Sequence, residues 1–171
     1  LAGLAEKERD FLSDALLGFL LCLAGIYLVL SWIFGSLTRP LVVMLVIPFG
    51  LIGAIWGHYF HSVPMTMFSI VGLIGMAGII INDSIVLITS IDGRAKTEAV
   101  RDAIVNGTTG RLRAVFLTSV TTVGGLGPML FEQSRAALFL KPTVVTLAYG
   151  LGFGMFLVLL VTPAMVAIQN D

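Results

Sequence analysis

The sequence has 171 residues, of which 57% are hydrophobic and only 12% are charged. Ordinary soluble domains carry about 25% charged residues, so this composition predicts an integral membrane protein. Ten basic and ten acidic residues cancel, which gives no reason to expect nucleic acid as a partner, and the single cysteine, Cys22, supports neither a disulfide nor a metal cluster. We expect no cofactor and no metal.

Residues 1–13 form a mixed polar stretch, which we expect to be a short polar helix or turn at the membrane surface that serves as a linker. This stretch lacks the basic start and short apolar core of a signal peptide. Because the first residue is Leu1 rather than Met, we expect the chain to be a fragment of a longer polypeptide.

Five apolar stretches follow, each long enough to cross a hydrocarbon core about 30 Å thick. We place these spans at residues 15–37, 41–57, 65–91, 114–131 and 142–168. Pro48 should kink the second span, because proline removes a backbone donor and crowds the preceding turn. The sequence therefore predicts an all-α, polytopic transmembrane helix bundle.

A basic segment separates the third and fourth spans, and residues 96–106 within it have the pattern of an amphipathic helix lying on the membrane surface. Cytoplasmic loops carry an excess of Lys and Arg, which favours this side as the cytoplasm and places the C-terminus there too. His58 and His61 fall in the turn expected between the second and third spans. We interpret them as turn residues at the lipid headgroups rather than as metal ligands.

The third span carries Asn82, Asp83 and Ser84 side by side at membrane depth. A charged group there costs about 2.5–3.5 kcal/mol on insertion scales, so a function is expected for it. The alternative is structural: Asn82 only bonds a neighbouring helix, while Asp83 stays protonated or reaches a water-filled inlet.

Glycines also mark the third span, where Gly72, Gly75 and Gly78 lie three residues apart and Asn82 continues the stripe. Small residues let helices approach closely in lipid, so we expect this stripe, and the polar group with it, on the packed face. The second and fifth spans repeat small residues at a spacing of four, which supports a compact bundle. These residues are Gly53 and Gly57, and Gly150 and Gly154.

On the fourth span, Thr118, Thr121, Thr122 and Gly125 fall on one helical face. Thr118 and Asn82 are expected at similar depth, where such a pair could carry a proton or an ion. The alternative is that these hydroxyls bond only to their own helix.

Four motifs in order carry a resemblance to a known family. They are PLVVMLVIPFGLIGA, GIIINDSIVLI, RLRAVFLTSVTTVGGLGPML and VTPAMVAI. Together they resemble the C-terminal membrane half of transporters of the resistance-nodulation-division (RND) superfamily, the proton-driven multidrug and metal efflux pumps of bacteria. The resemblance covers essentially the whole chain and implies spans eight to twelve of the family's twelve. It also implies that residues 1–13 are the end of the second periplasmic domain or its linker.

In that family, proton coupling uses two aspartates on the fourth span, a lysine on the tenth, and a threonine and an arginine associated with the eleventh. By position the threonine matches Thr118, and the arginine falls at Arg111 with Arg113 as its neighbour. The lysine position holds Asn82, which is a departure, because asparagine cannot carry a charge and the adjacent Asp83 has the opposite sign. The aspartate pair would lie in the absent N-terminal half.

The resemblance implies the membrane part of a proton-driven exporter of drugs or other amphiphilic compounds, not an enzyme, in the bacterial inner membrane. The full protein would be a homotrimer with a periplasmic adaptor and an outer-membrane channel, and the fragment would not transport without its N-terminal half. Three alternatives stay open: an RND-related component for lipid transport or protein secretion, an intramembrane aspartyl hydrolase, which would need a second carboxylate at membrane depth, and a non-transporting structural membrane subunit.

Overall fold

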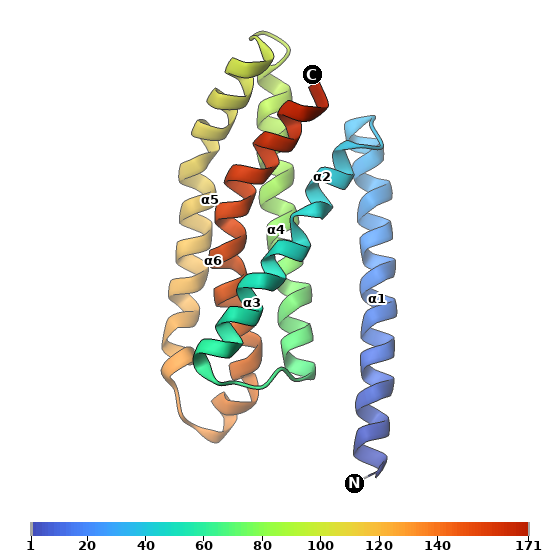
Figure 1. Ribbon diagram of the computed structural model, residues 1–171, viewed down its shortest axis with the longest axis vertical. Helices are drawn as coiled ribbons and strands as arrows, with labels where there is room; N and C mark the ends of the chain where they lie inside the picture. Colours follow the sequence, from blue (N-terminus) through green and yellow to red (C-terminus); the bar gives the residue numbers. More distant parts are fainter. Residues whose placement is uncertain (1, 171) are drawn as a thin grey trace.

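The computed structural model describes residues 2–170, without the side chains at positions 2, 4, 5, 136 and 170. Within that range the chain forms helices and no strand (Figure 1). The helices are α1 (Ala2–Phe34), α2 (Arg39–Leu45), α3 (Ile47–His61), α4 (Met67–Arg94), α5 (Val100–Phe131) and α6 (Arg135–Asn170). Five helical stretches in the described residues are long and apolar enough to cross a membrane, with α2 and α3 together making the second. The predicted all-α bundle of five spans is therefore confirmed.

The second span is broken where α2 meets α3, at Val46. Pro48 lies in the first turn of α3, a position where the missing amide of proline would be unpaired in any helix. The interruption therefore falls two residues before Pro48, where the sequence predicts a kink, and Val46 itself keeps right-handed helical backbone angles. At its other end α3 stops at His61, and Ser62 takes the left-handed conformation, with φ of 50°, that turns the chain toward α4.

The basic segment after the third span differs from its prediction. Residues 100–131 form one continuous helix, so the amphipathic stretch at 96–106 is not a separate surface helix. Its apolar positions pack on the end of α4: Ala103 and Gly107 are buried, and a Cβ atom at Gly107 would lie 2.9 Å from a side-chain carbon of Ile91. The amphipathic pattern reflects contact with another helix rather than with lipid.

Two helix ends also differ from the sequence prediction. Helix α1 already begins at Ala2, so the described part of residues 1–13 is helical and continues into the first span without a break. Helix α6 begins at Arg135 and contains Pro142, the residue at which the fifth span was expected to start. Leu1, on which the expectation of a longer polypeptide rests, lies outside the described residues.

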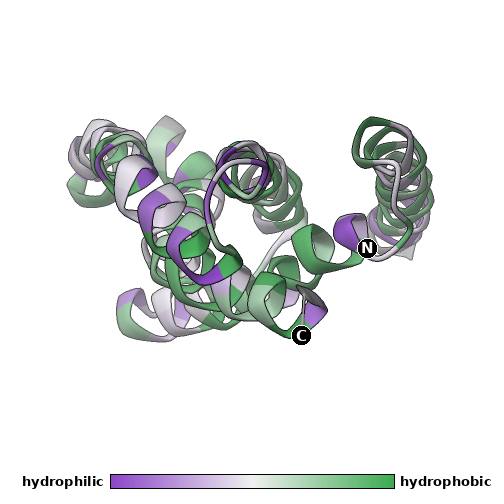
Figure 2. Cartoon of the chain, turned by 90° about the horizontal axis from the view of Figure 1, so that it is seen from above, coloured by the Kyte–Doolittle hydropathy of each residue, from purple (hydrophilic) through white to green (hydrophobic). Residues whose placement is uncertain are grey.

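Helix α6 is the centre of the bundle, because it packs against α3, α4 and α5. Figure 2 shows α1 standing apart from this group. The main core lies among α2, α4 and α6 and includes Leu30 of α1, and a smaller cluster forms between the end of α5 and the start of α6. Fully buried residues of the main core include Val42, Val43, Met76, Ile80, Leu87, Ile88 and Val166.

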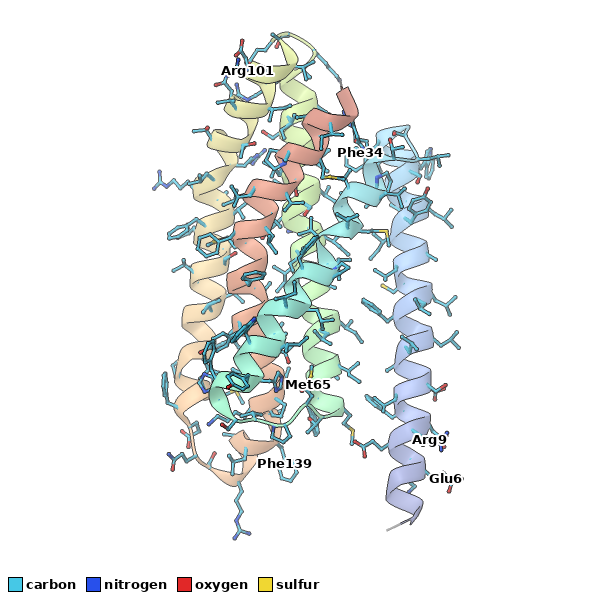
Figure 3. All side chains as sticks on the ribbon, viewed as in Figure 1. Glu6, Arg9, Phe34, Met65, Arg101 and Phe139 are labelled. Carbon is cyan, nitrogen blue, oxygen red and sulfur yellow. The ribbon has the colours of Figure 1, made fainter. Side chains whose placement is uncertain are left out.

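The charged segments gather at the two ends of the bundle. Figure 3 places Arg101 at one end, and Glu6, Arg9, Met65 and Phe139 toward the other. The C-terminus lies at the Arg101 end (Figure 1), and α4 and α6 run parallel with α5 antiparallel between them in the chain. The loops therefore fall on two opposite sides, as a multi-pass arrangement requires.

Candidate functional site

Asp83 lies on the face of α4 that packs against α6. It follows Met76 and Ile80 at helical spacings of seven and three residues, which bring all three onto one side of the helix. A Cβ atom at Gly154 of α6 would lie 2.7 Å from Ile80, and one at Gly150 would overlap the sulfur of Met76. Asp83 is only 8% exposed, and it makes no ion pair with any described residue. An acidic group is therefore held inside the helix cluster at membrane depth.

Asn82 faces away from this interior, which contradicts its expected place on the packed face. The glycine stripe on which that expectation rested winds around the helix, because a step of three residues falls about 60° short of a full turn. Gly72 packs on α6, with a hypothetical Cβ 2.9 Å from a backbone oxygen, whereas Gly78 has open space around it. Asn82 is exposed, like Gly75 and Gly78. The neighbouring residues Asn82 and Asp83 therefore point in different directions, Asn82 out of the bundle and Asp83 into it.

Thr118 bonds to its own helix. Its hydroxyl donates to the carbonyl oxygen of Ala114 at 2.9 Å, and Thr121 and Thr122 donate in the same way to Leu117 and Thr118, both at 2.8 Å. Thr118 and Thr121 are exposed. Within residues 2–170, no hydrogen bond joins Thr118 to Asn82 or Asp83. The structure therefore agrees with the alternative in which these hydroxyls bond only to their own helix.

Arg111 and Arg113 are exposed on the first half of α5, away from the apolar part of that helix. Neither forms an ion pair with a residue that the structure describes. Like Asn82 and Thr118, they present polar groups outward from the bundle. Of the predicted site residues, only Asp83 is enclosed by this chain.

Two further buried hydroxyls accompany Asp83 in the interior. Ser84 on α4 and Thr162 on α6 are fully buried, and neither hydroxyl has a hydrogen-bond partner among the described residues. An unpaired buried hydroxyl costs about 1–3 kcal/mol. Ser84 belongs to the polar triplet noted in the sequence. The sequence analysis did not single out Thr162, and the one local feature that marks this residue is the proline that follows it, Pro163.

His58 is not a headgroup residue, contrary to our interpretation of the sequence. It is 5% exposed, and its Nδ1 and Nε2 atoms lie 2.9 Å from the carbonyl oxygen of Val63 and 2.8 Å from Oγ1 of Thr146. The sequence contains a feature that could have indicated this burial, because His58 directly follows Gly57 of the closely packed pair Gly53 and Gly57 on α3.

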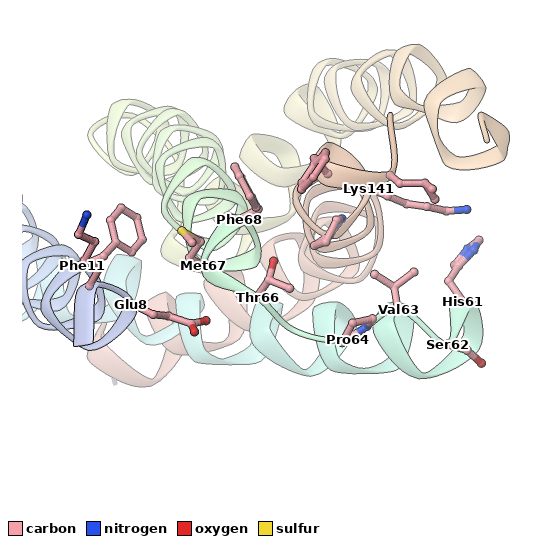
Figure 4. A pocket seen from close by; sticks show the side chains of 14 residues that line it. Glu8, Phe11, His61, Ser62, Val63, Pro64, Thr66, Met67, Phe68 and Lys141 are labelled. Atoms are coloured by element: carbon pink, nitrogen blue, oxygen red, sulfur yellow. The ribbon is translucent and has the colours of Figure 1, made fainter. Parts of the chain in front are cut away.

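A cavity of about 890 Å³ opens at the same end of the bundle (Figure 4). It is lined by α1, by the loop between α3 and α4, and by the starts of α4 and α6. Its lining is mostly apolar, with Phe11, Phe68 and Phe139 among it, and four side chains can carry charge there: Lys7, Glu8, His61 and Lys141. Such a lining suits a molecule that has both apolar and polar parts.

These features define a multi-pass membrane protein with an ionisable side chain inside its helix bundle. The model of the AcrB/AcrD/AcrF family matches residues 1–169. The chain therefore belongs to this family, and its resemblance to RND transporters is confirmed.

Curated relatives agree with this assignment. The swarming motility protein SwrC of Bacillus subtilis is 29% identical over 163 residues, which cover 94% of this chain and 16% of SwrC. The multidrug resistance protein MdtC of Edwardsiella ictaluri is 26% identical over 95% of this chain, and MdtC of Yersinia enterocolitica is 24% identical over the same share. The chain thus spans about 16% of the length of these relatives.

A solved structure has the same fold. The crystal structure of a heavy metal efflux pump superposes with a TM-score of 0.87 and 20% identity, over 97% of this chain and 16% of that pump. At this identity the likeness concerns the arrangement of helices alone.

Proposed function

We propose that this chain is membrane machinery of a proton-driven RND exporter of drugs or other amphiphilic compounds, and that Asp83 takes part in proton coupling. The observation that carries the proposal is the enclosed carboxyl group of Asp83 within a helix bundle of this family. A carboxyl group held away from lipid at membrane depth is the usual mark of a proton or ion path. Two relatives of this chain are named multidrug resistance proteins, which supports export as the activity.

The outward-facing residues support a second part of the proposal. Asn82, Thr118, Arg111 and Arg113 are all exposed here. Asn82 lies at membrane depth, where an exposed amide is costly unless protein or water covers it. We propose that an N-terminal half of the same transporter covers Asn82, Thr118 and Arg111 and supplies the acidic partners. On this view the chain does not transport alone.

The cavity beside the start of α1 supports the proposal of amphiphilic substrates, since it combines aromatic walls with Lys7, Glu8 and Lys141 at one membrane face. By the basic-residue rule, that face would be periplasmic and the Arg101 end, with the C-terminus, cytoplasmic. We further propose the bacterial inner membrane as the location, and a homotrimer with a periplasmic adaptor and an outer-membrane channel as the working assembly.

The test compares dye efflux by the full transporter carrying Asp83→Asn with efflux by the parent protein. Asparagine keeps the size of the side chain but cannot bind and release a proton. We expect efflux to fall to the level of transporter-free cells while the protein still reaches the membrane. Thr89→Ala is the matched control on α4, because the Thr89 hydroxyl is exposed and bonds only to its own helix.

Unchanged efflux in Asp83→Asn would overturn the coupling role. If the parent transporter moves no dye under any proton gradient, the alternatives of lipid transport, protein secretion or a structural role take its place.

A further inference from the structure

A groove crosses the outer face of α6 between α3 and α5. Both of these helices pack against α6 (Figure 1), but within the described residues they do not contact each other. Two neighbouring hollows, of about 360 Å³ toward α3 and about 380 Å³ toward α5, share Gly152 and Phe156 of α6. Together they form what we call the α6 groove, and six residues define it: Trp56, Phe60, Val120, Gly124, Gly152 and Phe156.

Glycines keep this groove open at membrane depth. A Cβ atom at Gly124 or Gly152 would meet nothing within 4 Å, whereas one at Gly154, on the packed side of α6, would lie 2.7 Å from Ile80. The lining contains no charged side chain and is almost entirely apolar. A water molecule needs two to four polar partners at such a depth, so water does not fill the groove. The apolar species that a bilayer offers is the acyl chain of a lipid.

A basic side chain lies on the groove side of α5. Val120 and Gly124 follow Arg113 by seven and eleven residues, which places all three on one face of the helix. Arg113 directly precedes the apolar stretch at residues 114–131, at the level expected for lipid headgroups. At a rise of 1.5 Å per residue, Val120 lies about 10 Å deeper than Arg113. One leaflet of the hydrocarbon core is about 15 Å thick, so a single lipid can reach from Arg113 into the groove.

Few other charges lie near Arg113. Its side chain is exposed and forms no ion pair with any residue that the structure describes. The one acidic residue of α5 is Asp102, about 16 Å further along the helix and so beyond the screening length of about 10 Å at 0.1 M salt. Helix α6 has no charged residue between Lys141 and Asn170, and α3 has no Asp, Glu, Lys or Arg. The positive charge of Arg113 therefore remains available to an anion.

We propose that the α6 groove binds an anionic phospholipid, with Arg113 contacting the headgroup and one acyl chain lying over Gly124 and Gly152. Arg111 does not belong to this site. It lies two residues before Arg113, which is about 200° around the helix, on the face that carries Thr118. The two arginines of α5 thus have different surroundings, and the lipid site is independent of the coupling role proposed for Asp83.

Native mass spectrometry tests the headgroup contact, because it counts the lipids that stay bound when the protein is released from detergent micelles. Two lipids with the same acyl chains are titrated: phosphatidylglycerol, which is anionic, and phosphatidylethanolamine, which is zwitterionic. We expect the parent protein to bind phosphatidylglycerol about fivefold more tightly, as one arginine at a membrane surface allows. Arg113→Gln should abolish this preference, and Arg111→Gln, the matched control, should keep it.

Variants of the groove floor test the position of the acyl chain. Gly152→Leu places a side chain where the acyl chain would lie, and the open space there lets the helices keep their packing. Binding of both lipids should weaken several-fold, because the chain loses its van der Waals contacts with the groove. Gly124→Leu makes the same test from α5 if Gly152→Leu does not fold. Gly25→Leu on α1, where a Cβ atom also meets nothing within 4 Å, is the control and should bind both lipids like the parent.

Three results would each overturn the proposal. The first is equal binding of the two lipids by the parent protein. The second is a preference for phosphatidylglycerol that survives Arg113→Gln, or one that Arg111→Gln reduces just as much. The third is parent-like lipid binding in both Gly152→Leu and Gly124→Leu, which would mean that protein rather than lipid covers the groove.

Discussion

Individual glycines set how closely α3 and α6 approach. A Cβ atom at Gly53 would lie 2.6 Å from the carbonyl oxygen of Tyr149 and 2.5 Å from the Cβ of Phe153, and one at Gly57 would meet the ring of Tyr149. Gly78 on α4 has nothing within 4 Å of such an atom. The spacing of four residues between Gly53 and Gly57 predicts close packing, and the structure confirms it.

Replacing Gly53 with alanine should lower the free energy of unfolding by about 1–3 kcal/mol, because the added methyl overlaps a backbone oxygen that moves only with α6. Gly78→Ala is the control, and it should raise stability by up to about 1 kcal/mol through helix propensity. Denaturant unfolding in detergent micelles, followed by circular dichroism, measures both. Equal losses in the two variants would contradict close packing at Gly53.

The sequence predicted a polar group at membrane depth but not which residue is enclosed. Neighbouring residues of a helix point about 100° apart, so only one of Asn82 and Asp83 can face α6. The choice depends on which side of α4 packs, and a glycine spacing of three left that side undefined. The burial of His58 and Thr162 depends on contacts with distant segments, which the local sequence pattern does not contain.

At the scale of helices, one end of the bundle is held together by polar contacts between distant segments. Arg39 at the start of α2 pairs with Asp92 near the end of α4, with 3.0 Å between Nη1 and Oδ1. The Gln169 side chain of α6 donates to the carbonyl oxygen of Thr38 at 3.2 Å. Three helices that are far apart in the chain therefore meet at this end.

A double-mutant cycle with Arg39→Gln and Asp92→Asn should give a coupling free energy of about 1 kcal/mol, since the side chains are only 17% and 33% exposed. The control cycle is the pair Arg94 and Glu98, whose arginine is 44% exposed, and a smaller coupling of about 0.2–0.5 kcal/mol is expected for it. Unfolding free energies of the single and double variants supply both numbers. A coupling for Arg39 and Asp92 no larger than the control would show that this pair does not hold the helices together.

The number of membrane-spanning helices could be predicted from the hydropathy of the sequence, but the residues at which the helices begin and end could not. Apolar residues at helical spacing mark one covered face, but the pattern is the same whether lipid or another helix covers it. For this reason residues 96–106 were expected on the membrane surface, although Ala103 and Gly107 pack against α4. The sequence likewise predicts a separate polar segment at residues 1–13, whereas α1 runs through the described part of them without a break.

For the whole molecule, the main asymmetry is the sparse packing of α1, which contacts only α2 and α4 among the described helices. In the most apolar part of α1 only 6% of the residues are buried, against 44% in the corresponding part of α4. Helices gain little hydrophobic energy from one another inside lipid, so an apolar helix remains stable there without close neighbours. The arrangement therefore requires a bilayer or a further protein segment around α1.

Cys22 offers a direct test of this arrangement, because it is exposed on α1 in the middle of its apolar stretch. A spin label on Cys22 in lipid nanodiscs should collide more often with oxygen, which concentrates in lipid, than with a water-soluble nickel complex. Power-saturation electron paramagnetic resonance measures both collision rates. A higher rate with the nickel complex would mean that α1 does not cross the membrane at this depth.

Helix α6, which covers the Asp83 face of α4, comes last in the chain, and this order affects how the protein is inserted into the membrane. The ribosome completes Asp83 before it begins α6, and at about 5–20 residues per second the covering helix arrives only seconds later. During that interval the translocon must release α4 with its acidic side chain unshielded, at a cost of about 2.5–3.5 kcal/mol. The isoleucines and leucines around Asp83 each favour insertion by about 0.3–0.6 kcal/mol. Together they must offset the cost of the acidic side chain and keep α4 in the membrane until α6 has been synthesised.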